Sequence, residues 1–524
     1  MKKILFILLS FAIFATSCME DTGNYDYRDI EDFEITGVES GYSVLILENL
    51  NIPASISAAA GDFSAVWFIE QKDISAGFDD NTVADTISRE LVLDIPFKYK
   101  PGTYNLYLKV TNNNTGVAKY AKTEILASTQ FSTGYYLLKE TSDGNTEMDL
   151  HYTNGDKVED IISFVTGAPL SGKPKTLSYL NDYSYLNEAT GEKDVNYLLL
   201  PLSENGMYTF NMTDMSIARE YGQWFYSADD TYDVKKIHHI NSVGFSFAMF
   251  TESGVFTNYQ CAMYQMYSVG KFSPLPDLMY DGTNNYSSSN NVCYFEFDNY
   301  TYDAVNNQLI SVDYNGGVSS VSFQYPPLLA DQDPTPESFE DKIIYIGGVQ
   351  GYATDNLVIV CEKADGSRYF YYAMAQSESY EMNIANKADF EASSAFADAK
   401  IYATCRKDGN YLYAASGNDV YAINPENGAS TKLVIPSMPA GEITYMDTMW
   451  YETSGDDSYN YFVIATENSG NYTVAFYEMI GGEPVKGKEP VRILQGKGKI
   501  KTVQHADPGK NGNVWSMTRY SVHY

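Results

Sequence analysis

Residues 401–428, IYATCRKDGNYLYAASGNDVYAINPENG, read as three short strands separated by turns. Each strand is rich in Tyr, Ile, Val and Ala, and the turns contain Asp408-Gly409, Gly417-Asn418 and Asn427-Gly428. Gly and Asn tolerate the positive φ angles that tight hairpins require. Three antiparallel strands cannot bury both of their apolar faces alone, so the pattern predicts copies of the same unit on either side.

Similar strand–turn–strand units recur along the chain, at residues 134–151, 195–211, 243–259, 302–314, 356–372 and 459–477. Their mean spacing of about 56 residues fits a four-stranded propeller blade with a long loop. We therefore predict an all-β chain whose residues 129–524 form a β-propeller of about seven blades. Two irregular β-sandwiches with the same hairpins are the alternative. Residues 499–504 or residues 514–522 are candidates for the strand that completes the first blade.

Residues 33–128 read as a separate immunoglobulin-like β-sandwich. Gly102–Asn112, GTYNLYLKVTN, alternates between apolar and polar residues and resembles the G-x-Y-x-L-x-L-x-V-x-N strand of PKD domains. Trp67 lies in a third predicted strand, where a sandwich core often holds a large aromatic side chain. This first domain is expected to serve as a spacer or an adhesive module.

The N-terminal residues 1–17 have the features of a signal peptide. Lys2 and Lys3 precede an apolar segment, residues 4–15, that is too short to span a bilayer as a helix. Small residues lead up to Cys18, as in a bacterial lipobox, so we expect cleavage before Cys18 and acylation of its thiol. Ordinary cleavage with an unmodified cysteine is the alternative. Residues 18–32 are acidic and poor in aliphatic side chains, and should form a lipid-anchored tether.

The chain as a whole resembles the PKD-like family lipoproteins of Bacteroidetes. The resemblance is carried by the lipobox at Cys18, by residues 23–27 (GNYDY), by Gly102–Asn112, and by residues 134–139 (GYYLLK) followed by residues 143–145 (DGN). It implies a lipoprotein anchored in the outer membrane. Glu20-Asp21, shortly after Cys18, is similar to the acidic signal that directs such lipoproteins to the cell exterior. The resemblance also implies association with SusC/SusD-type importers, which take up oligosaccharides or oligopeptides. The family supplies no catalytic residues to carry over.

The net charge of −33, from 35 Lys and Arg and 68 Asp and Glu, argues against nucleic acid and anionic membrane surfaces as partners. We therefore expect a non-enzymatic accessory subunit of a SusC/SusD-type importer that binds oligosaccharide or oligopeptide, or hands it on. Aromatic residues in polar loops are the candidate ligand contacts: Trp224, Tyr226, Trp450 and Tyr451. The alternative for these rings is packing between blades.

A surface glycoside hydrolase or lyase is the alternative function. Paired carboxylates on propeller strands can hydrolyse glycosides, and Asp313, Glu362 and Glu478 lie in or beside predicted strands. No G-x-S-x-G, H-E-x-x-H or sialidase-type box is present, and no catalytic residue is assigned.

No metal site or cofactor is expected. A structural calcium ion bound by acidic loop residues is the alternative. The two candidate groups are Asp331, Asp333 and Glu337, and Asp229, Asp230 and Asp233, although neither group fits an EF-hand loop. Besides Cys18, the cysteines are Cys261, Cys293, Cys361 and Cys405. No C-x-x-C is present, and buried thiols are favoured over disulfides, with Cys261–Cys293 as the pair to consider first.

Overall fold

The computed structural model describes the following residues: 33–57, 61–72, 84–99, 101–129, 131, 133–186, 193–226, 232–239, 246–259, 270–272, 275–294, 298–313, 316–324, 339, 341–350, 355–375, 381–391, 394–405, 409–451 and 459–506. The chain divides into two compact units, Met1–Ser128 and Thr129–Tyr524. The predicted signal peptide, Cys18 and the acidic tether lie outside the described residues.

The first unit is a β-sandwich. Its main sheet has the strand order β2 (Gly41–Leu45), β9 (Ala118–Ser128), β8 (Gly102–Asn112), β5 (Phe63–Gln71) and β6 (Asp85–Ser88). Two small ladders complete it, formed by β3 (Asn49–Ile52) with β7 (Leu93–Pro96) and by β1 (Ile35–Thr36) with β4 (Ser55–Ile56). The sequence did not indicate β3, β4 or β6, which are short and rich in polar residues.

The PKD-type strand β8 is confirmed. Tyr104, Leu106, Leu108 and Val110 are buried and alternate with partly exposed residues, as a strand with one face on a core requires. Trp67 on β5 is fully buried, and its indole Nε1 donates a hydrogen bond to the Leu91 carbonyl at 3.2 Å. The indole thus fills the sandwich core without an unsatisfied polar atom.

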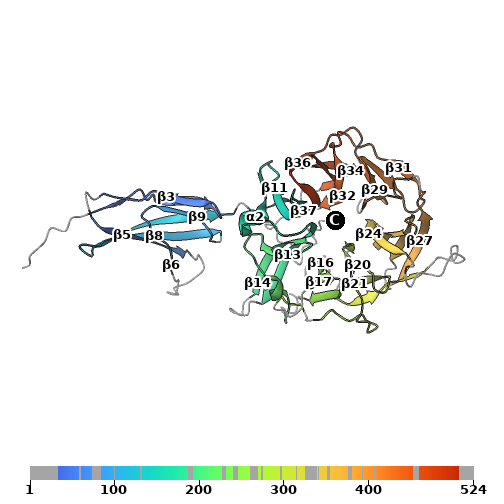
Figure 1. Cartoon of the computed structure of the whole chain (residues 1–524), viewed down its shortest axis with the longest axis horizontal. Helices are drawn as coiled ribbons and strands as arrows, with labels where there is room; N and C mark the ends of the chain where they lie inside the picture. Colours follow the sequence, from blue (N-terminus) through green and yellow to red (C-terminus); the bar gives the residue numbers. More distant parts are fainter. Residues whose placement is uncertain are drawn as a thin grey trace, which may run out of the picture. The chain divides into compact units, whose positions relative to one another are not determined.

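The second unit is a seven-bladed β-propeller (Figure 1). The strands within the blades pair antiparallel, except for one parallel pair in blade 5, and the innermost strand of each blade is named first below. Blade 1 contains β37 (Lys499–Ala506), β10 (Gly134–Glu140), β11 (Thr146–His151) and β12 (Lys157–Val158); blade 2 contains β13 (Pro174–Leu186), β14 (Lys193–Ser203) and β15 (Phe210–Asn211); blade 3 contains β16 (Val234–His239), β17 (Ser246–Thr251) and β18 (Gly254–Tyr259); blade 4 contains β19 (Val292–Tyr294), β20 (Asp298–Asp303), β21 (Gln308–Asp313) and β22 (Val318–Ser320).

Of the remaining three blades, blades 5 and 7 have five strands and blade 6 has four. Blade 5 contains β24 (Lys342–Gln350), β25 (Asp355–Glu362), β26 (Arg368–Ala375), β27 (Glu381–Asp389) and β23 (Ser322–Gln324), the last of which pairs in parallel with β27. Blade 6 contains β28 (Ile401–Thr404), β29 (Leu412–Ser416), β30 (Asp419–Ile423) and β31 (Ser430–Lys432). Blade 7 contains β32 (Glu442–Tyr451), β33 (Tyr459–Asn468) and β34 (Asn471–Ile480), and β34 pairs with both β35 (Glu483–Pro484) and β36 (Arg492–Lys497).

The C-terminal strand β37 closes the ring. It pairs with β10 from Gly134↔Ala506 to Glu140↔Lys499, so the end of the chain supplies the innermost strand of the first blade. Of the two candidates for this strand, residues 499–504 therefore take the position, and residues 514–522 lie outside the described residues. Each of the seven predicted hairpin units falls in a different blade, which excludes the alternative of two irregular sandwiches.

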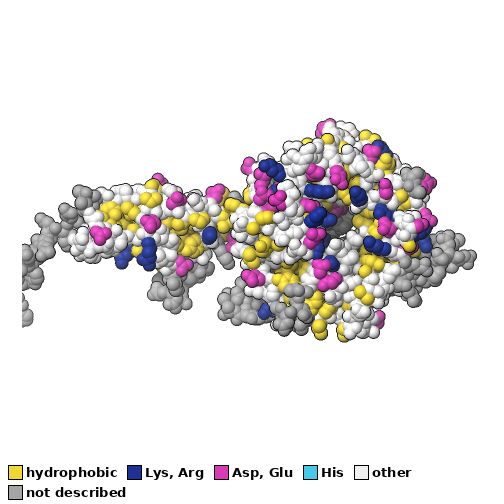
Figure 2. All heavy atoms as spheres, in the orientation of Figure 1, with side chains coloured by type: hydrophobic (Ala, Val, Ile, Leu, Met, Phe, Trp, Pro, Cys, Tyr) yellow, Lys and Arg dark blue, Asp and Glu magenta, His cyan; other side chains and the backbone are white. Residues whose placement is uncertain are grey.

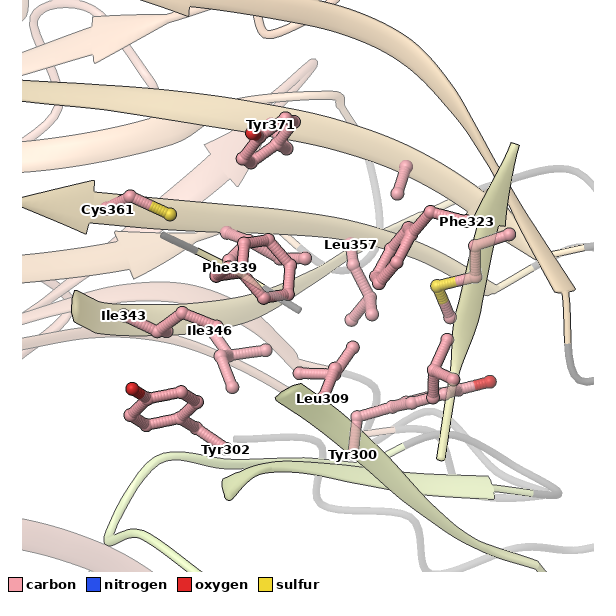
Figure 3. Packing of buried hydrophobic residues seen from close by; sticks show 14 of the residues in the cluster. Tyr300, Tyr302, Leu309, Phe323, Phe339, Ile343, Ile346, Leu357, Cys361 and Tyr371 are labelled. Atoms are coloured by element: carbon pink, nitrogen blue, oxygen red, sulfur yellow. The ribbon is translucent and has the colours of Figure 1, made fainter. Parts of the chain in front are cut away.

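The apolar cores lie between consecutive blades. Figure 3 shows the cluster between blades 4 and 5, where Tyr300, Tyr302 and Leu309 of blade 4 meet Phe339, Ile346 and Leu357 of blade 5 or its approach. Corresponding clusters join blades 2 and 3, 3 and 4, 5 and 6, 6 and 7, and 7 and 1. Blades 3 to 7 therefore bury both faces against their neighbours, and blades 1 and 2 each bury one face in these clusters, as expected of repeats that stabilise one another.

Helix is scarce in the described part of the chain. It consists of α2 (Ile161–Thr166) and the 3₁₀ helix η1 (Tyr221–Trp224), neither of which is long and apolar enough to span a membrane. Residues 389–400 carry the best helical pattern of the sequence, but β27 extends to Asp389 and residues 394–400 form turns. Phe390 and Phe396 stack at 5.3 Å between centroids and are buried between blades 5 and 6, and this packing overrides local propensity.

Candidate functional site

The inner strands of the seven blades run in the same direction and begin at one face of the ring. Three contacts join their first residues from blade to blade. Lys175 Nζ of β13 lies 2.5 Å from Oδ1 of Asp233, directly before β16. Asn291, directly before β19, donates from Nδ2 to the Ile344 carbonyl of β24 at 3.1 Å. Lys499 Nζ of β37 lies 3.8 Å from Glu442 Oε2 of β32.

A charged residue followed by Ile recurs at these strand starts, as Lys342-Ile343, Lys400-Ile401, Glu442-Ile443 and Lys499-Ile500. Successive side chains of a strand point to opposite sides. The isoleucine can therefore pack between blades, where Ile343, Ile443 and Ile500 are buried, while the charged residue before it is exposed. The repeat thus places a charge at the same point of blades 5, 6, 7 and 1.

Lysine dominates these positions. We call the set the lysine mouth; it consists of Lys175, Lys235, Lys342, Lys400, Lys499 and Lys501. Each lies at the first three positions of an inner strand or directly before it. In Figure 2, Lys and Arg side chains, with some acidic ones among them, surround the middle of the ring. Five of the seven inner strands contribute, so the propeller fold concentrates cations from distant parts of the sequence.

One carboxylate sits between two of these lysines. Asp233 Oδ1 accepts from Lys175 Nζ of blade 2 at 2.5 Å, and Oδ2 accepts from Lys235 Nζ of blade 3. Burial works to raise the pKa of Asp233, but the bonds from Lys175 and Lys235 outweigh it and hold the pKa below its usual value. Lysines of neighbouring inner strands are thus spaced so that one carboxylate can bridge them.

The other side of the lysine mouth has a different charge balance. Lys342, Lys400 and Lys501 are exposed, and no described acidic residue forms an ion pair with them. The nearby acid Asp341 accepts a hydrogen bond from the Tyr369 hydroxyl at 3.0 Å, and Asp398 is exposed before Lys400. Three ammonium groups of blades 5, 6 and 1 are therefore exposed, and among the described residues the ion pair at the inner strand starts of blades 5, 6, 7 and 1 is the long Lys499–Glu442 contact.

Trp224 does not lie at this site. It ends η1 and is fully buried in the cluster between blades 2 and 3, with its ring 5.5 Å from Tyr183 and its Nε1 donating to Thr209 Oγ1 at 3.3 Å. This position corrects the expectation that Trp224 contacts a ligand, because its ring has no exposed surface. Packing between blades, the alternative stated above, describes its place.

The other three predicted contacts are scattered. The Tyr226 side chain is 62% exposed, and Lys271 Nζ lies 5.9 Å from the centroid of its ring. Trp450 is half-buried at the far end of β32, eight residues beyond Glu442, which is about 26 Å along a strand. The Tyr451 side chain lies outside the described part of the structure. The structure does not gather these aromatic residues into one surface, and the repeated charge-Ile pattern was the sequence signal that marked the lysine mouth.

The carboxylates considered for catalysis are engaged elsewhere. Asp313 is buried and accepts from the Tyr280 hydroxyl at 2.8 Å and from the Gly317 amide at 3.0 Å. Glu362 pairs with Arg368 at 2.7 Å, and Glu478 pairs with Lys488 at 2.6 Å. These acids come from β21, β25 and β34 of three different blades, outside the innermost strands, and do not form a pair.

The described residues contain no group of three or more His, Cys, Asp and Glu that could hold a metal ion. Of the acids considered for calcium, Asp233 is held by the two lysines, and the others lie outside the described residues. Cys293, Cys361 and Cys405 are buried cysteine thiols, and burial raises the pKa of the Cys361 thiol to about 12. Cys261 lies outside the described residues.

A second polar cluster joins the first and last blades. Lys139 of β10 contacts Asp149 of β11 at 2.7 Å and Asp160 at 2.8 Å, and Asp149 accepts from Tyr472 of β34. Burial works to lower the pKa of Lys139, but the two carboxylates outweigh it and raise that pKa. Lys139, Asp149 and Tyr472 are almost completely buried, so this cluster stabilises the ring and is not open to a substrate.

A comparison with known protein families identifies the N-terminal part of the chain. Residues 18–174 match the model of the PKD-like family. The match spans the β-sandwich and strands β10, β11 and β12 of blade 1, and ends at the first residue of β13. No curated protein matches the chain.

Several solved structures are similar in part. A quinonprotein alcohol dehydrogenase-like protein from Bacteroides thetaiotaomicron has 12% identity and a TM-score of 0.40, with 89% of this chain and 96% of that chain covered. A Synechocystis ACO mutant has 9% identity and a TM-score of 0.37, with 88% and 96% covered. The complex of fission yeast SREBP–SCAP binding domains has 10% identity and a TM-score of 0.28, with 57% and 69% covered. The assignment of the propeller rests on its own strand pairing.

Proposed function

We propose that this chain is a non-catalytic lipoprotein of the outer membrane, exposed on the cell surface, that binds an oligomeric nutrient for a SusC/SusD-type importer. Its lipid would be carried by Cys18, and the acidic residues 18–32 would form the tether. The β-sandwich would act as a spacer and the propeller as the ligand-binding module. A rigid ring that gathers side chains from several blades at its centre suits binding.

One observation carries the choice of binding over hydrolysis. The inner strands present lysines at their common face, whereas Asp313, Glu362 and Glu478 lie outside the innermost strands and are bonded to Tyr280, Arg368 and Lys488. Glycoside hydrolysis needs two carboxyl groups about 5–10 Å apart across the scissile bond. A cluster of ammonium groups can hold a ligand but provides no such pair.

The test is affinity capture of the full-length, tagged protein from solubilised outer membrane, followed by mass spectrometry of proteins and co-purified oligomers. Stoichiometric recovery of a SusC/SusD-type pair supports the proposal, and recovery of the protein alone contradicts the importer role. A Cys18→Ala variant, which cannot be acylated at this position, should leave the membrane fraction. Release of reducing ends from oligosaccharides by the purified protein would favour the glycoside hydrolase instead.

A further inference from the structure

We propose that the lysine mouth binds an acidic oligosaccharide, with Lys342, Lys400 and Lys501 contacting its carboxylate or sulfate groups. This inference rests on the proposed binding function and specifies its ligand class. The neighbouring blades 5 and 6 supply Lys342 and Lys400, respectively. Blade 1, which follows blade 7 in the ring, supplies Lys501. The three ammonium groups therefore come from separate blades and can contact charges on successive sugar units.

The charge balance of the lysine mouth is opposite to that of the chain. The whole sequence has 35 Lys and Arg against 68 Asp and Glu. Directly before the inner strands or in their first three positions, eight lysines, which are the lysine mouth together with Lys173 and Lys236, stand against Asp233, Asp341 and Glu442. Lysines from five blades together make the electrostatic potential at the lysine mouth favourable for an anion. An anionic ligand that approaches this acidic protein is therefore attracted to the lysine mouth.

The protein itself shows that one carboxylate can bridge lysines at the starts of two neighbouring inner strands. Asp233 bridges Lys175 and Lys235 of blades 2 and 3, one oxygen to each ammonium group. Lys342 and Lys400 occupy the corresponding strand starts of blades 5 and 6, and no described carboxylate bridges them. A carboxylate or sulfate of a ligand would complete the same arrangement, and Lys501 would contact a further anionic group.

The absence of apolar contacts favours a glycan over an acidic peptide. None of the exposed large hydrophobic side chains of the described propeller belongs to an inner strand; they are Phe164, Ile217, Tyr226, Leu275, Leu278, Tyr280, Val305, Val434, Ile480, Val491 and Ile493. Peptide recognition normally combines backbone contacts with pockets for side chains. A ligand that offers anionic and hydroxyl groups alone matches the lysine mouth better.

Isothermal titration calorimetry of the full chain tests the inference with four probes. Oligogalacturonate carries carboxylates, chondroitin sulfate oligosaccharide carries sulfates as well, cello-oligosaccharide is neutral, and oligoglutamate is an acidic peptide. We expect either or both acidic glycans to bind, more weakly as salt rises, and the other two probes not to bind. The triple variant Lys342→Gln, Lys400→Gln, Lys501→Gln should weaken acidic glycan binding about ten- to hundredfold.

The matched control is the triple variant Lys432→Gln, Lys486→Gln, Lys488→Gln, which removes the same charge from exposed lysines outside the inner strands. It should bind as the parent protein does. Equal losses in both triple variants would overturn the assignment to the lysine mouth, and tight binding of oligoglutamate there would overturn the glycan class. Binding of the neutral glycan alone would refute this inference and leave the proposed function standing, whereas failure of both the titrations and the membrane capture would remove both.

Discussion

The Tyr472 hydroxyl lies 2.7 Å from Oδ2 of Asp149, and this contact joins the last blade of the propeller to the first. Tyr472 belongs to β34 and Asp149 to β11, 323 residues apart. His151 Nε2 lies 2.7 Å from the same hydroxyl. Because Tyr472 donates to Asp149, the imidazole donates to Tyr472 and is neutral with its proton on Nε2. The ring is therefore closed by a buried polar network as well as by β37.

Tyr472→Phe should destabilise the propeller. The substitution removes the hydroxyl that connects Asp149 to His151. Asp149 Oδ2 keeps its bond from Lys139, but the buried His151 Nε2 loses the Tyr472 hydroxyl, which costs about 1–3 kcal/mol. Chemical denaturation followed by tyrosine and tryptophan fluorescence measures the loss. Tyr208→Phe is the control, because Tyr208 is half-buried against Phe210 and its hydroxyl forms no described hydrogen bond. Equal stabilities of the two variants would show that the network does not support closure.

The stability of the propeller should depend on His151 between about pH 4 and pH 6.5. Burial, followed by the charge of Lys157, lowers the pKa of His151 from 6.5 to about 4 in the folded chain. The unfolded chain binds a proton in this interval that the folded chain does not, so stability from this group falls as pH decreases from 6.5 to 4. The full effect is on the order of 2–3 kcal/mol.

The variant His151→Gln isolates this contribution, because its amide can donate to Tyr472 but does not titrate. Burial also raises the pKa values of Glu147 and Asp149, whose contributions change in the opposite direction with pH, so the two proteins must be compared at each pH. The free energy of unfolding of the variant should decrease less between pH 6.5 and pH 4. Parallel pH profiles would refute the assignment.

Trp224 and Tyr226 should respond differently to truncation, although they are two residues apart. Trp224→Ala empties a fully buried site between blades 2 and 3 and should cost about 3–5 kcal/mol of unfolding free energy. Tyr226→Ala removes a ring that is 62% exposed and should change stability by less than about 0.5 kcal/mol. Thermal unfolding of both variants checks the pair. A destabilised Tyr226→Ala protein with an unaffected Trp224→Ala protein would reverse these placements.

The three buried thiols should be unreactive in the folded protein. In the variant Cys18→Ser, Cys261→Ser, the aromatic disulfide reagent DTNB should find no reactive thiol under native conditions at pH 8. The raised pKa of Cys361 and the burial of Cys293, Cys361 and Cys405 both suppress thiolate attack. Denaturation should expose three thiols per chain. Fewer than three would indicate a disulfide among them, against the described structure.

Most of the propeller fold was predictable from the repeated hairpins in the sequence. Gly417 takes φ of 59° in the turn between Ser416 and Asp419, as the sequence predicted, and each predicted hairpin occupies its own blade. Local turn chemistry and period-2 patterns are readable because they involve neighbouring residues. For the strand that closes the ring, the sequence left two candidates. Residues 499–506 pair with residues 134–140, and a pairing between such distant segments has no signature in the local sequence.

The candidate site was less accessible to sequence reasoning. Trp224 and Trp450 stood out as aromatic residues in polar loops, but the Trp224 ring is buried between blades 2 and 3, and Trp450 is half-buried at the end of β32. Lys342 and Lys400 looked like ordinary surface lysines, because nothing local indicates that their strands are innermost. Only the ring brings these starts to one face, and the charge-Ile repeat becomes informative once the blades are counted.

Covalent mapping of the bound ligand tests the role of the lysine mouth most directly. Oligogalacturonate activated as an N-hydroxysuccinimide ester is added to the full chain below one equivalent, and the modified lysines are identified by peptide mass spectrometry. Modification concentrated on Lys342, Lys400 and Lys501, and suppressed by unactivated oligogalacturonate, is the predicted result. Modification spread equally over Lys432, Lys486 and Lys488, with no suppression by the free glycan, would contradict a binding site at the centre of the ring.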